Sequence, residues 1–334
     1  MLTLDPAVRA ALLEALVAGD LLRANDGLAR LPGPAGRLRV ERVNNARTAE
    51  AAPVWRAEAD GRHLFRFHER SWAQHPRLIF GRWLDMLPLV AAVMAAGARG
   101  RVSFNLGDEA HRPGLSFCDR RDDAVLVPDC MFMATGAYAA LARHFAAQAL
   151  PWTRRRPVLF WRGATSGTAD GVDFLPRVQL CRLARRLGDQ ADVGLSAVTD
   201  AFRAAEPTLR AEELVRPFVP AEATADVQLH VDIDGNSNSW PGLFTKLLSG
   251  SPVLKVASPQ GFRQWYYPRL VPGVNFVPVR ADLADLLDVA RDLLADPDRA
   301  QAIGKAGRRL ALDLSLDREV AAAVPRIRAA FEPF

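Results

Sequence analysis

Polar residues that suit phosphate binding follow an apolar stretch near the middle of the chain. The stretch, PVLFW, leads into Arg162 and Gly163, and then into Thr165 and Ser166. Glycine allows the backbone to approach a phosphate, while hydroxyls, free N–H groups and a bidentate arginine can bind it. The spacing matches neither Gly-x-Gly-x-x-Gly nor the Walker sequence, which disfavours nicotinamide cofactors and ATP. By itself the pattern also fits an ordinary strand-to-helix turn with a surface arginine.

A second apolar stretch, VQLHVDI, is followed by a loop rich in residues that tolerate a positive φ angle. Ser239 can begin a helix that Gly250 ends, so this helix N-terminus also suits an anion. Lys246 lies about two turns along the helix; it reaches a diphosphate only if its side chain runs back, and is otherwise a solvated lysine. The loop residues that we expect to hold the ligand are Asp234, Gly235, Asn236, Ser237, Asn238, Ser239 and Trp240.

Two aspartates at the end of this stretch raise the question of a metal ion. Asp232 and Asp234 alternate, so in a strand both carboxylates face the same way and could hold Mg²⁺ or Mn²⁺. Such a site needs further oxygen ligands or phosphates beside it, whereas two helix N-termini and Arg162 could already neutralise a diphosphate. We therefore favour a structural role, in which Asp234 caps the turn and Asp232 makes an internal hydrogen bond.

A third candidate group lies upstream, in the segment SFNLGDEAHRPG. Asp108 and Glu109 follow a predicted strand directly, and a carboxylate there can take a proton from a hydroxyl group. A turn aspartate is the alternative for Asp108, and His111 is a rival base. The sequence contains no Gly-x-Ser-x-Gly elbow and no His-Glu-x-x-His motif, so it does not support a serine hydrolase or a zinc peptidase.

Helices and strands that can position these groups are visible along the whole chain. Helical spacing of apolar residues predicts helices over 1–30, 77–100 and 132–150. The segment HLFRFHER alternates polar and apolar residues, as a half-buried strand does. After PWTRRRP the order of strand, glycine-containing turn and helix recurs, which predicts a parallel sheet covered on both faces.

This order of elements predicts an α/β fold of two domains. The N-terminal domain, expected over residues 1–152, would lie on the acceptor side. The C-terminal domain, expected over 153–315, would be Rossmann-like and bind the nucleotide, because open parallel sheets bind ligands at the carboxyl ends of their strands. The last helix, about 316–334, could pack back on the N-terminal domain.

The composition is that of a globular protein, since 334 residues with 49% hydrophobic residues suffice for two domains. Cys118, Cys130 and Cys181 lie far apart, which argues for a reducing compartment and against structural zinc. Neither a signal peptide nor an apolar run of membrane-spanning length is visible, so we expect a cytoplasmic protein. The net charge of +5 suits an anionic ligand or a phospholipid surface, and a solvated arginine-rich surface accounts for it equally well.

Taken together, the motifs resemble glycosyltransferase family 90, which contains bacterial lipopolysaccharide-modifying enzymes, fungal capsule xylosyltransferases and animal protein O-glucosyltransferases. The resemblance lies, in order, in FNLGDE, FWRGATSGT, DGNSNSWPGLFTKLLSGSPVLKV and WYYPRLVPGVNFVPVRADLADLL. These segments cover most of residues 100–310, and the last is the most specific because its aromatic pair and two prolines recur as a unit. Its aromatic residues Trp265, Tyr266 and Tyr267 belong either to the core or to a platform for a sugar.

The resemblance implies a GT-B architecture, in which two Rossmann-like domains face each other across the donor site without a required metal. It implies an inverting displacement in which Asp108 deprotonates the acceptor hydroxyl. It also implies that Arg162 binds the donor diphosphate and that the Asp-Gly-Asn-Ser turn completes a pocket around UDP and the sugar. This sequence departs from the animal members in lacking a secretory signal, a retention tail and paired cysteines. Its segment SNSWPGLFTKLL is less basic than theirs, which leaves Lys246 as a substitute cation.

We therefore expect an inverting, UDP-sugar-dependent glycosyltransferase that modifies a hydroxyl of a glycan, such as lipopolysaccharide or another cell-surface polysaccharide. The donor would carry glucose, xylose or galactose, and neither a metal ion nor a nucleic-acid partner is expected. Peripheral contact with the inner face of an anionic membrane is expected as well. Two alternatives stay open: a metal-dependent transferase that uses Asp232 and Asp234, and a non-catalytic protein that binds nucleotide sugars or glycans.

Overall fold

The computed structural model describes residues 2–43, 52–110 and 112–334, which form two compact units. Unit 1 comprises residues 1–137 together with 315–334, and unit 2 comprises 138–314. The division thus falls before helix α7 (Ala139–Ala147), where the sequence prediction placed it after that helix, near residue 152. The C-terminal helix belongs to the same unit as the N-terminal residues.

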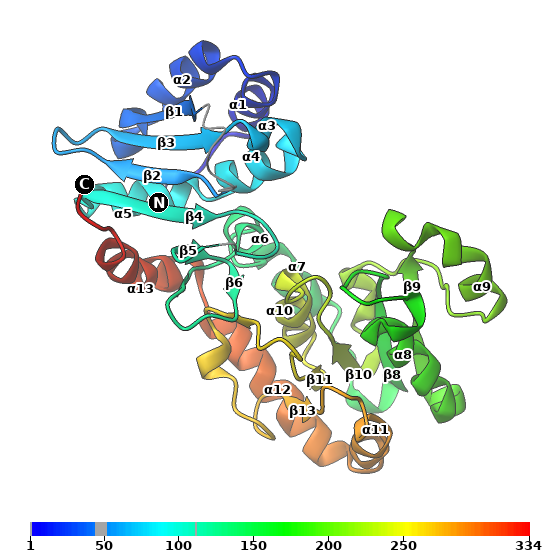
Figure 1. Cartoon of the computed structure of the whole chain (residues 1–334). Coiled ribbons are helices and arrows are strands. Elements are labelled where there is room, and N and C mark those ends of the chain that lie inside the picture. The colour runs from blue at the N-terminus through cyan, green and yellow to red at the C-terminus, as the bar shows by residue number, and fades with distance from the viewer. Residues whose placement is uncertain (1, 44–51, 111) are drawn as a thin grey trace. The chain divides into compact units, whose positions relative to one another are not determined.

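Unit 1 is built on a mixed six-stranded sheet with the order β1-β3-β2-β4-β5-β7 (Figure 1). Strands β1 and β3 are parallel, β2 is antiparallel to both of its neighbours, and β4, β5 and β7 are parallel. The alternation predicted for HLFRFHER is confirmed, because every second residue of β3 is buried. The strands of this sheet are β1 Leu38–Val43, β2 Val54–Ala57, β3 His63–His68, β4 Gly100–Asn105, β5 Leu115–Ser116 and β7 Val125–Leu126, and the short strand β6 Cys118–Asp119 is not part of it.

One face of this sheet packs on an aromatic core. Phe65 of β3 lies with its ring centroid 5.1 Å from that of Trp55 on β2 and 5.3 Å from that of Trp83. All three side chains are almost fully buried, and such aromatic contacts dominate the burial of apolar area. The helices of unit 1 are α1 Pro6–Ala18, α2 Leu21–Ala29, α3 Arg70–Ala73, α4 Pro76–Asp85, α5 Leu87–Ala95, α6 Cys130–Ala134 and α13 Leu316–Ala329.

Among the described residues, no single helix is long and apolar enough to cross a membrane. Helices α4 and α5 reach that length and composition only as a pair, and they are bent by 46° where they meet. Both helices contribute buried residues to unit 1, among them Trp83, Leu84, Val90 and Val93.

Unit 2 is built on a five-stranded sheet in which every strand runs parallel to its neighbours. Its order is β13-β11-β10-β8-β9, so β10 lies in the centre and all carboxyl ends meet at one edge (Figure 1). The prediction of an α/β fold is thereby confirmed. The strands of this sheet are β8 Arg156–Ala164, β9 Ala191–Ala197, β10 Val227–Asp232, β11 Val253–Val256 and β13 Val277–Val279, and the short strand β12 Arg263–Gln264 is not part of it.

The sheet of unit 2 is covered on both faces, as the near-continuous burial of β10 shows. One face packs in a large apolar core to which α8, α9, α11 and α12 contribute. Helix α10 lies on the other face, where its side chains reach the sheet, and it also packs against α7 and α12. The helices are α8 Pro176–Ala184, α9 Glu206–Ala211, α10 Trp240–Ser249, α11 Leu286–Ala295 and α12 Pro297–Asp313.

None of the three predicted helices is continuous: residues 1–30 contain α1 and α2, residues 77–100 contain α4 and α5, and the third is interrupted most widely. Residues 132–150 do not form a continuous helix, because α6 ends at Ala134 and α7 begins at Ala139. Between them Gly136, Ala137 and Tyr138 have φ angles of 59°, 60° and 57°. Three consecutive residues in the left-handed region cannot continue a right-handed helix. The alanine-rich composition of this segment favours a helix, and the tertiary structure overrides it.

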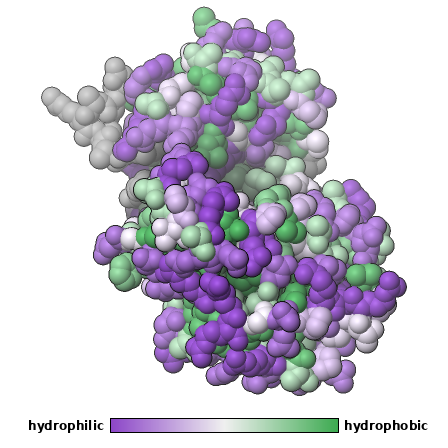
Figure 2. Space-filling view, turned by 90° about the vertical axis from the view of Figure 1, so that its right-hand side faces the viewer, coloured by the Kyte–Doolittle hydropathy of each residue, from purple (hydrophilic) through white to green (hydrophobic). Residues whose placement is uncertain are grey.

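The surface is mostly polar. Figure 2 shows hydrophilic residues over much of the visible face, with apolar residues scattered among them. The most exposed large apolar side chains, Leu22, Phe174, Phe218 and Phe334, lie far apart in the sequence. Single exposed apolar residues of this kind are ordinary in globular proteins.

Candidate functional site

A small cavity lies at the carboxyl edge of the sheet of unit 2, where the sequence placed the ligand. It encloses about 50 Å³ and is lined by turns that follow three neighbouring strands. This volume is far below the roughly 300–1,000 Å³ of ordinary ligand pockets, so the cavity can enclose only a part of a nucleotide sugar. The turn residues include Ser166, Gly167 and Thr168 after β8, Asp234 and Gly235 after β10, and Ala257 and Pro259 after β11.

Arg177, in the first turn of α8, ties two of these turns together. Its guanidinium donates to the Ser166 Oγ at 2.6 Å and to the Ala164 carbonyl at 3.1 Å, both at the end of β8. It also donates to the carbonyls of Asp234 at 2.8 Å and Ile233 at 3.2 Å, at the end of β10. One buried side chain therefore fixes the distance between the two strand ends.

The charge of Arg177 is held in a nearly closed environment. Burial lowers the pKa of the Arg177 guanidinium, while the carboxylates of Asp232 and Asp234 oppose that shift. A buried cation needs nearby negative charge or acceptors, which the four bonds supply. Sequence reasoning missed this residue. The available signal was its position, because a cation in the first turn of a helix is unfavourable to the helix dipole unless it has another function.

The two turns are also in direct contact with each other. The Gly167 N–H donates to the Asn236 side-chain oxygen at 2.9 Å, and Gly167 has a φ angle of 131° that favours glycine. A Cβ atom at Gly235 would lie 2.4 Å from the Ser166 Oγ and 2.8 Å from an Arg177 nitrogen. Gly167 is therefore favoured by its φ angle, and Gly235 by the close approach of Ser166 and Arg177.

Unused acceptor atoms lie in the turn after β10. Asn238 donates to the Asp234 Oδ1 at 3.0 Å and to the Phe262 carbonyl at 3.3 Å. The Asp234 Oδ2 and the Asn238 Oδ1 are buried and have no hydrogen-bond partner within the described part of the chain. Buried polar atoms normally have partners, so each such atom calls for an explanation. Hydroxyl or N–H groups of a bound ligand are the partners that these two acceptors fit.

Asp232, at the end of β10, has a structural role. Its carboxylate accepts from the Lys246 ammonium at 2.9 Å and contacts the Lys255 ammonium at 3.3 Å, and its side chain is only 1% exposed. Burial alone raises the pKa of the Asp232 carboxyl, but the two lysines outweigh it, so the pKa lies below its ordinary value. The expected internal bond of Asp232 is confirmed. Lys246 is bonded to this carboxylate rather than solvated, and its role toward a diphosphate stays a prediction.

Arg162 points away from the cavity. It lies two residues before the end of β8, so the alternation of the strand directs its side chain to the sheet face that carries Phe160. There it pairs with Asp192 at 2.5 Å and donates to the Pro217 carbonyl at 3.2 Å. Its binding to a diphosphate therefore stays a prediction that this geometry does not favour.

Several other predicted residues of these loops have structural partners. Thr165 is fully buried, and its hydroxyl accepts from the Thr199 N–H at 2.8 Å. Gly163 lies against the Trp161 ring, where a Cβ would meet a ring carbon at 2.5 Å. Ser237 accepts from the Gly235 N–H through its carbonyl at 2.9 Å. Ser239 is the N-cap of α10 and Gly250 its C-cap, as predicted, and Trp240 is the first residue of that helix.

The aromatic segment 265–267 is mostly core. Trp265 and Tyr266 are buried, with their ring centroids 4.9 Å apart. Tyr267 is half-buried, and its ring lies 4.9 Å from the Lys255 ammonium. The packing thus supports the core alternative for the first two rings.

In unit 1, Asp108 lies in the loop that follows β4. Its Oδ1 accepts from the Arg82 guanidinium at 2.8 Å, and its side chain is 44% exposed. Arg82 also donates to the Leu106 carbonyl at 2.8 Å, so it holds the loop as well as the carboxylate. The sequence did not reveal Arg82 as a partner, because helix α4 lies well upstream of the loop. The rival base His111 lies outside the described residues.

Within residues 2–43, 52–110 and 112–334, no group of three or more His, Cys, Asp or Glu side chains could hold a metal ion. The carboxylate oxygens of Asp232 face two ammonium groups, and Asp234 Oδ1 accepts from Asn238. The proposed Asp232–Asp234 pair is therefore not arranged as a metal site. The expectation that the activity needs no metal stays a prediction.

The sequence profile of glycosyl transferase family 90 matches residues 79–320. The chain belongs to this family. The resemblance seen in the motifs is thus confirmed, and the match extends it upstream of residue 100. Arg82, Asp108 and Arg177 all lie within the matched region of this family 90 member, whereas β1, β2 and β3 precede it.

Among curated relatives, the family 90 chain is 25% identical to uncharacterized protein 027R of Frog virus 3 (isolate Goorha) over 225 residues. That alignment covers 58% of this chain and 23% of the viral protein. The chain is 27% identical to uncharacterized protein 035R of Invertebrate iridescent virus 3 over 147 residues, which are 41% of this chain and 13% of the relative. The chain therefore matches less than a quarter of the length of either relative.

Solved structures similar to this family 90 chain include sucrose-phosphate synthase from Thermosynechococcus elongatus, with 16% identity and a TM-score of 0.39. The match covers 58% of this chain and 49% of the synthase. HepE of Anabaena in complex with UDP gives 12% identity and a TM-score of 0.38, with 57% and 52% covered. TarM gives 10% identity and a TM-score of 0.40, with 54% and 37% covered.

Proposed function

We propose that the protein is an inverting, UDP-sugar-dependent glycosyltransferase of GT-B type that transfers a sugar to a hydroxyl of a glycan. Membership of family 90 supports the reaction class. The observation that carries the donor site is the pair of turns tied by Arg177, with the buried acceptors Asp234 Oδ2 and Asn238 Oδ1 beside them. These groups lie at the carboxyl edge of a parallel sheet, where such folds bind nucleotides.

The donor site would bind a sugar diphosphate through backbone and hydroxyl groups more than through exposed cations. Ser166 and Thr168 line the cavity and offer hydroxyls, and the N-terminus of α10 follows the turn after β10. Arg177 holds both turns in place and adds a positive charge behind them. The two buried acceptors would bind hydroxyl groups of the ribose or the sugar. Arg162 and Lys246 are proposed as further cations only if their present partners release them.

The proposed reaction is a single displacement at the anomeric carbon. The acceptor oxygen forms a bond to that carbon while the bond to the diphosphate oxygen breaks, and UDP leaves with the electron pair. Asp108 takes the proton of the acceptor hydroxyl, a role that contributes about 10² to 10⁴ in rate. Its half-exposed carboxylate suits this role, because a substrate can reach it while Arg82 holds Oδ1.

The identity of the substrates is proposed on general grounds. Glucose, xylose and galactose donors fit the resemblance equally, and a cell-surface polysaccharide such as lipopolysaccharide is the proposed acceptor. We propose that the reaction takes place at the cytoplasmic face of a membrane, without a metal ion. The bonds of Asp232 to two lysines support the metal-free proposal over a site built from Asp232 and Asp234.

A thermal-shift screen of the purified protein tests the donor proposal. A ligand that binds only the folded state raises the melting temperature in proportion to the logarithm of its concentration. We expect UDP and one UDP-sugar to raise it, and ADP-glucose and inorganic phosphate at equal concentration to raise it less. The screen is repeated with EDTA, which should leave the shift unchanged. If no uridine nucleotide raises the melting temperature at millimolar concentration, the donor proposal is overturned.

A further inference from the structure

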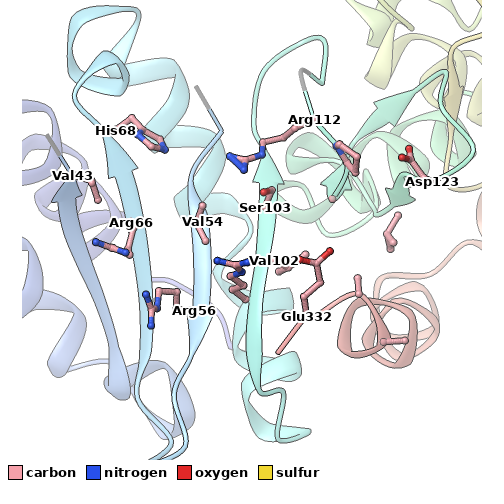
Figure 3. Close-up of a pocket in the computed structure, with 16 residues that line it drawn as sticks. Val43, Val54, Arg56, Arg66, His68, Val102, Ser103, Arg112, Asp123 and Glu332 are labelled. Atoms are coloured by element: carbon pink, nitrogen blue, oxygen red, sulfur yellow. The ribbon is translucent and has the colours of Figure 1, made fainter. Parts of the chain in front are cut away.

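The second face of the sheet in unit 1 is open and carries arginines. Opposite the aromatic core, cross-strand pairing sets Arg56 of β2 directly beside Arg101 of β4. In the next row, Val54 of β2 lies between Arg66 of β3 and Ser103 of β4. Figure 3 shows Arg56, Arg66 and Ser103 on the same side of the sheet. On this face Arg56 and Arg66 are half-buried and Arg101 is exposed, whereas every residue of β10 in unit 2 is buried.

A large cavity lies over this face. It has a volume of about 700 Å³, within the range of pockets that hold small molecules. The sheet forms its floor, and Arg112, which precedes β5, and Asp123, which precedes β7, contribute to one wall (Figure 3). Residues that follow α13, including Glu332, form another wall, because Glu332 and Arg101 exchange backbone hydrogen bonds of 2.8 and 2.9 Å. All parts of the cavity belong to unit 1.

The arginines of this cavity are only partly neutralised. Arg56 pairs with Glu58 at 3.1 Å, and Arg66 contacts Glu41 at 3.4 Å. The Arg101 side chain is exposed, and no carboxylate among the described residues lies within ion-pair distance of it. Like charges directly opposite each other on antiparallel strands destabilise a sheet. The juxtaposition of Arg56 and Arg101 therefore favours a bound anion that both can contact.

We propose that this cavity is a second binding site of the protein, specific for an acidic saccharide. The charged end of the saccharide, a phosphate or a carboxylate, binds between Arg101 and Arg56. Guanidinium groups bind such oxygens through paired, charge-assisted hydrogen bonds. The inference goes beyond the proposed transfer reaction, because it concerns a site built only from residues of unit 1 that needs no donor.

The rest of the lining fits the sugar part of such a ligand. Asp123 and Glu332 are acceptors that repel a second anionic group but can receive hydroxyl donors. Ser103 adds a hydroxyl on the floor, beside the apolar side chain of Val54. A cavity that offers cations at one place and carboxylates at another suits a ligand with one charged end and several hydroxyls. His68 also lines the cavity, and the Phe334 ring centroid lies 4.6 Å from the Arg56 guanidinium.

Isothermal titration of the full chain tests the proposal with glucose 6-phosphate and glucuronate as probes, and with glucose and inorganic phosphate as references. We expect at least one acidic sugar to bind at least tenfold more tightly than glucose and inorganic phosphate. The preferred probe distinguishes a phosphate from a carboxylate as the charged end. The proposal is overturned if neither acidic sugar binds with a dissociation constant below about 10 mM. It is also overturned if inorganic phosphate binds as tightly as the acidic sugars.

Two variants locate the binding. Arg101→Gln should weaken the binding of the preferred acidic sugar about tenfold, because one charge-assisted bond is lost. Arg99→Gln is the matched control, since Arg99 is an exposed arginine of the same unit that does not line the cavity, and it should leave the affinity unchanged. Arg101→Lys keeps the charge and should retain part of the affinity. Equal losses in Arg99→Gln and Arg101→Gln would overturn the assignment of the cavity.

A membrane surface is the competing occupant, because an arginine-rich face also attracts anionic lipids. Flotation with phosphatidylglycerol vesicles decides between the two. If the vesicles bind in a manner that Arg101→Gln abolishes while no acidic sugar binds, the saccharide proposal is wrong. The titrations use no UDP-sugar, so their failure leaves the proposed transfer reaction standing, and failure of the donor screen leaves this proposal standing.

Discussion

Two aspartates that end strands of the two units show opposite uses of a carboxylate. Asp232, at the end of β10 in unit 2, is 1% exposed and bonded to two lysine side chains. Asp108, in the loop after β4 in unit 1, is 44% exposed and bonded to one arginine. Both follow apolar strands in the sequence, and both were candidates for chemistry. Their surroundings, not their local sequence, separate them.

The difference in burial and in partners indicates whether each carboxylate contributes to stability or to catalysis. A carboxylate enclosed between two ammonium groups cannot accept a proton or bind a metal without breaking buried ion pairs, so it contributes to stability. A half-exposed carboxylate is accessible to a substrate and can take up its proton at little structural cost. Substitutions of the two residues should therefore have different effects. A change at Asp108 should lower the transfer rate and leave the stability unchanged, whereas a change at Asp232 should mainly lower the stability.

The largest effect is expected for Asp108→Asn. The amide cannot take up the proton of the acceptor hydroxyl, so the transfer rate should fall about 10²- to 10⁴-fold while UDP affinity stays unchanged. The rate is measured as turnover of the donor found in the thermal-shift screen, and UDP affinity by titration. Glu109→Gln is the matched control from the next position in the same loop. Near wild-type turnover of Asp108→Asn would remove this residue as the base and favour a different base or a non-catalytic protein.

Asp232→Asn should have the second largest effect, and on stability. The substitution leaves Lys246 and Lys255 buried without a compensating charge, which costs about 3–5 kcal/mol when one partner of a buried pair is removed. Urea unfolding measures the loss. Asp226→Asn is the control, because it removes a carboxylate from an exposed pair with Arg156, where about 0–1 kcal/mol is expected. Similar losses in the two variants would contradict the structural role assigned to Asp232.

Acid should destabilise the protein through His230, which lies beside this buried pair on β10. Burial lowers the pKa of His230 to about 3, below its ordinary value of 6.5, and neither ring nitrogen has a partner among the described residues. Between pH 6.5 and about 3 the unfolded chain binds a proton that the folded chain does not. The free energy of unfolding is therefore greatest above pH 6.5 and falls by about 1.4 kcal/mol per pH unit below it.

Urea unfolding at pH 7 and pH 5 measures this effect, for which about 2 kcal/mol is expected. Two other groups titrate in the same range: burial lowers the pKa of His63 to about 4 and raises that of Asp129 to about 6. As the pH falls, His63 lowers the free energy of unfolding, as His230 does, whereas Asp129 raises it. The variant His230→Leu isolates the effect, because its pH dependence should lack the part due to His230. An equal fall in the wild type and the variant would refute it.

A smaller effect than these is expected for Arg177→Lys, which tests whether the turns of unit 2 bind the donor. Lysine keeps the charge but cannot bond to both strand ends at once, so UDP affinity should fall about tenfold. Arg182→Lys is the control, since Arg182 lies on the same helix and pairs with Glu212 and Asp173 away from the cavity. Unchanged UDP affinity in Arg177→Lys would show that the tie between the turns does not matter for binding.

The same titration with Arg162→Ala tests the residue that the sequence analysis predicted to bind the donor diphosphate. Its guanidinium is bonded to Asp192 and the Pro217 carbonyl in the structure. We expect the loss of UDP affinity to be smaller than for Arg177→Lys. A larger loss would mean that Arg162 leaves Asp192 when the donor binds.

The sequence predicted the secondary structure correctly wherever a local pattern of a few residues determines it. The alternation in β3, the helix from Ser239 to Gly250 and the strand-turn-helix order of unit 2 could all be read directly, because these patterns depend on neighbours only a few residues apart. The break between α6 and α7 could not, because alanine favours a helix and only the tertiary structure holds Ala137 and Tyr138 at positive φ angles.

By itself the sequence determined the family, the α/β class and the two loops that end β8 and β10. Those follow from periodicity and from the types of residues in each turn. The tertiary structure alone decided that Lys246 binds Asp232, that Arg162 turns to Asp192 and that Arg177 joins the two loops. The physical reason is that a buried charge must find its partner across neighbouring strands and helices, and strand order and register, not spacing along the chain, set which groups meet.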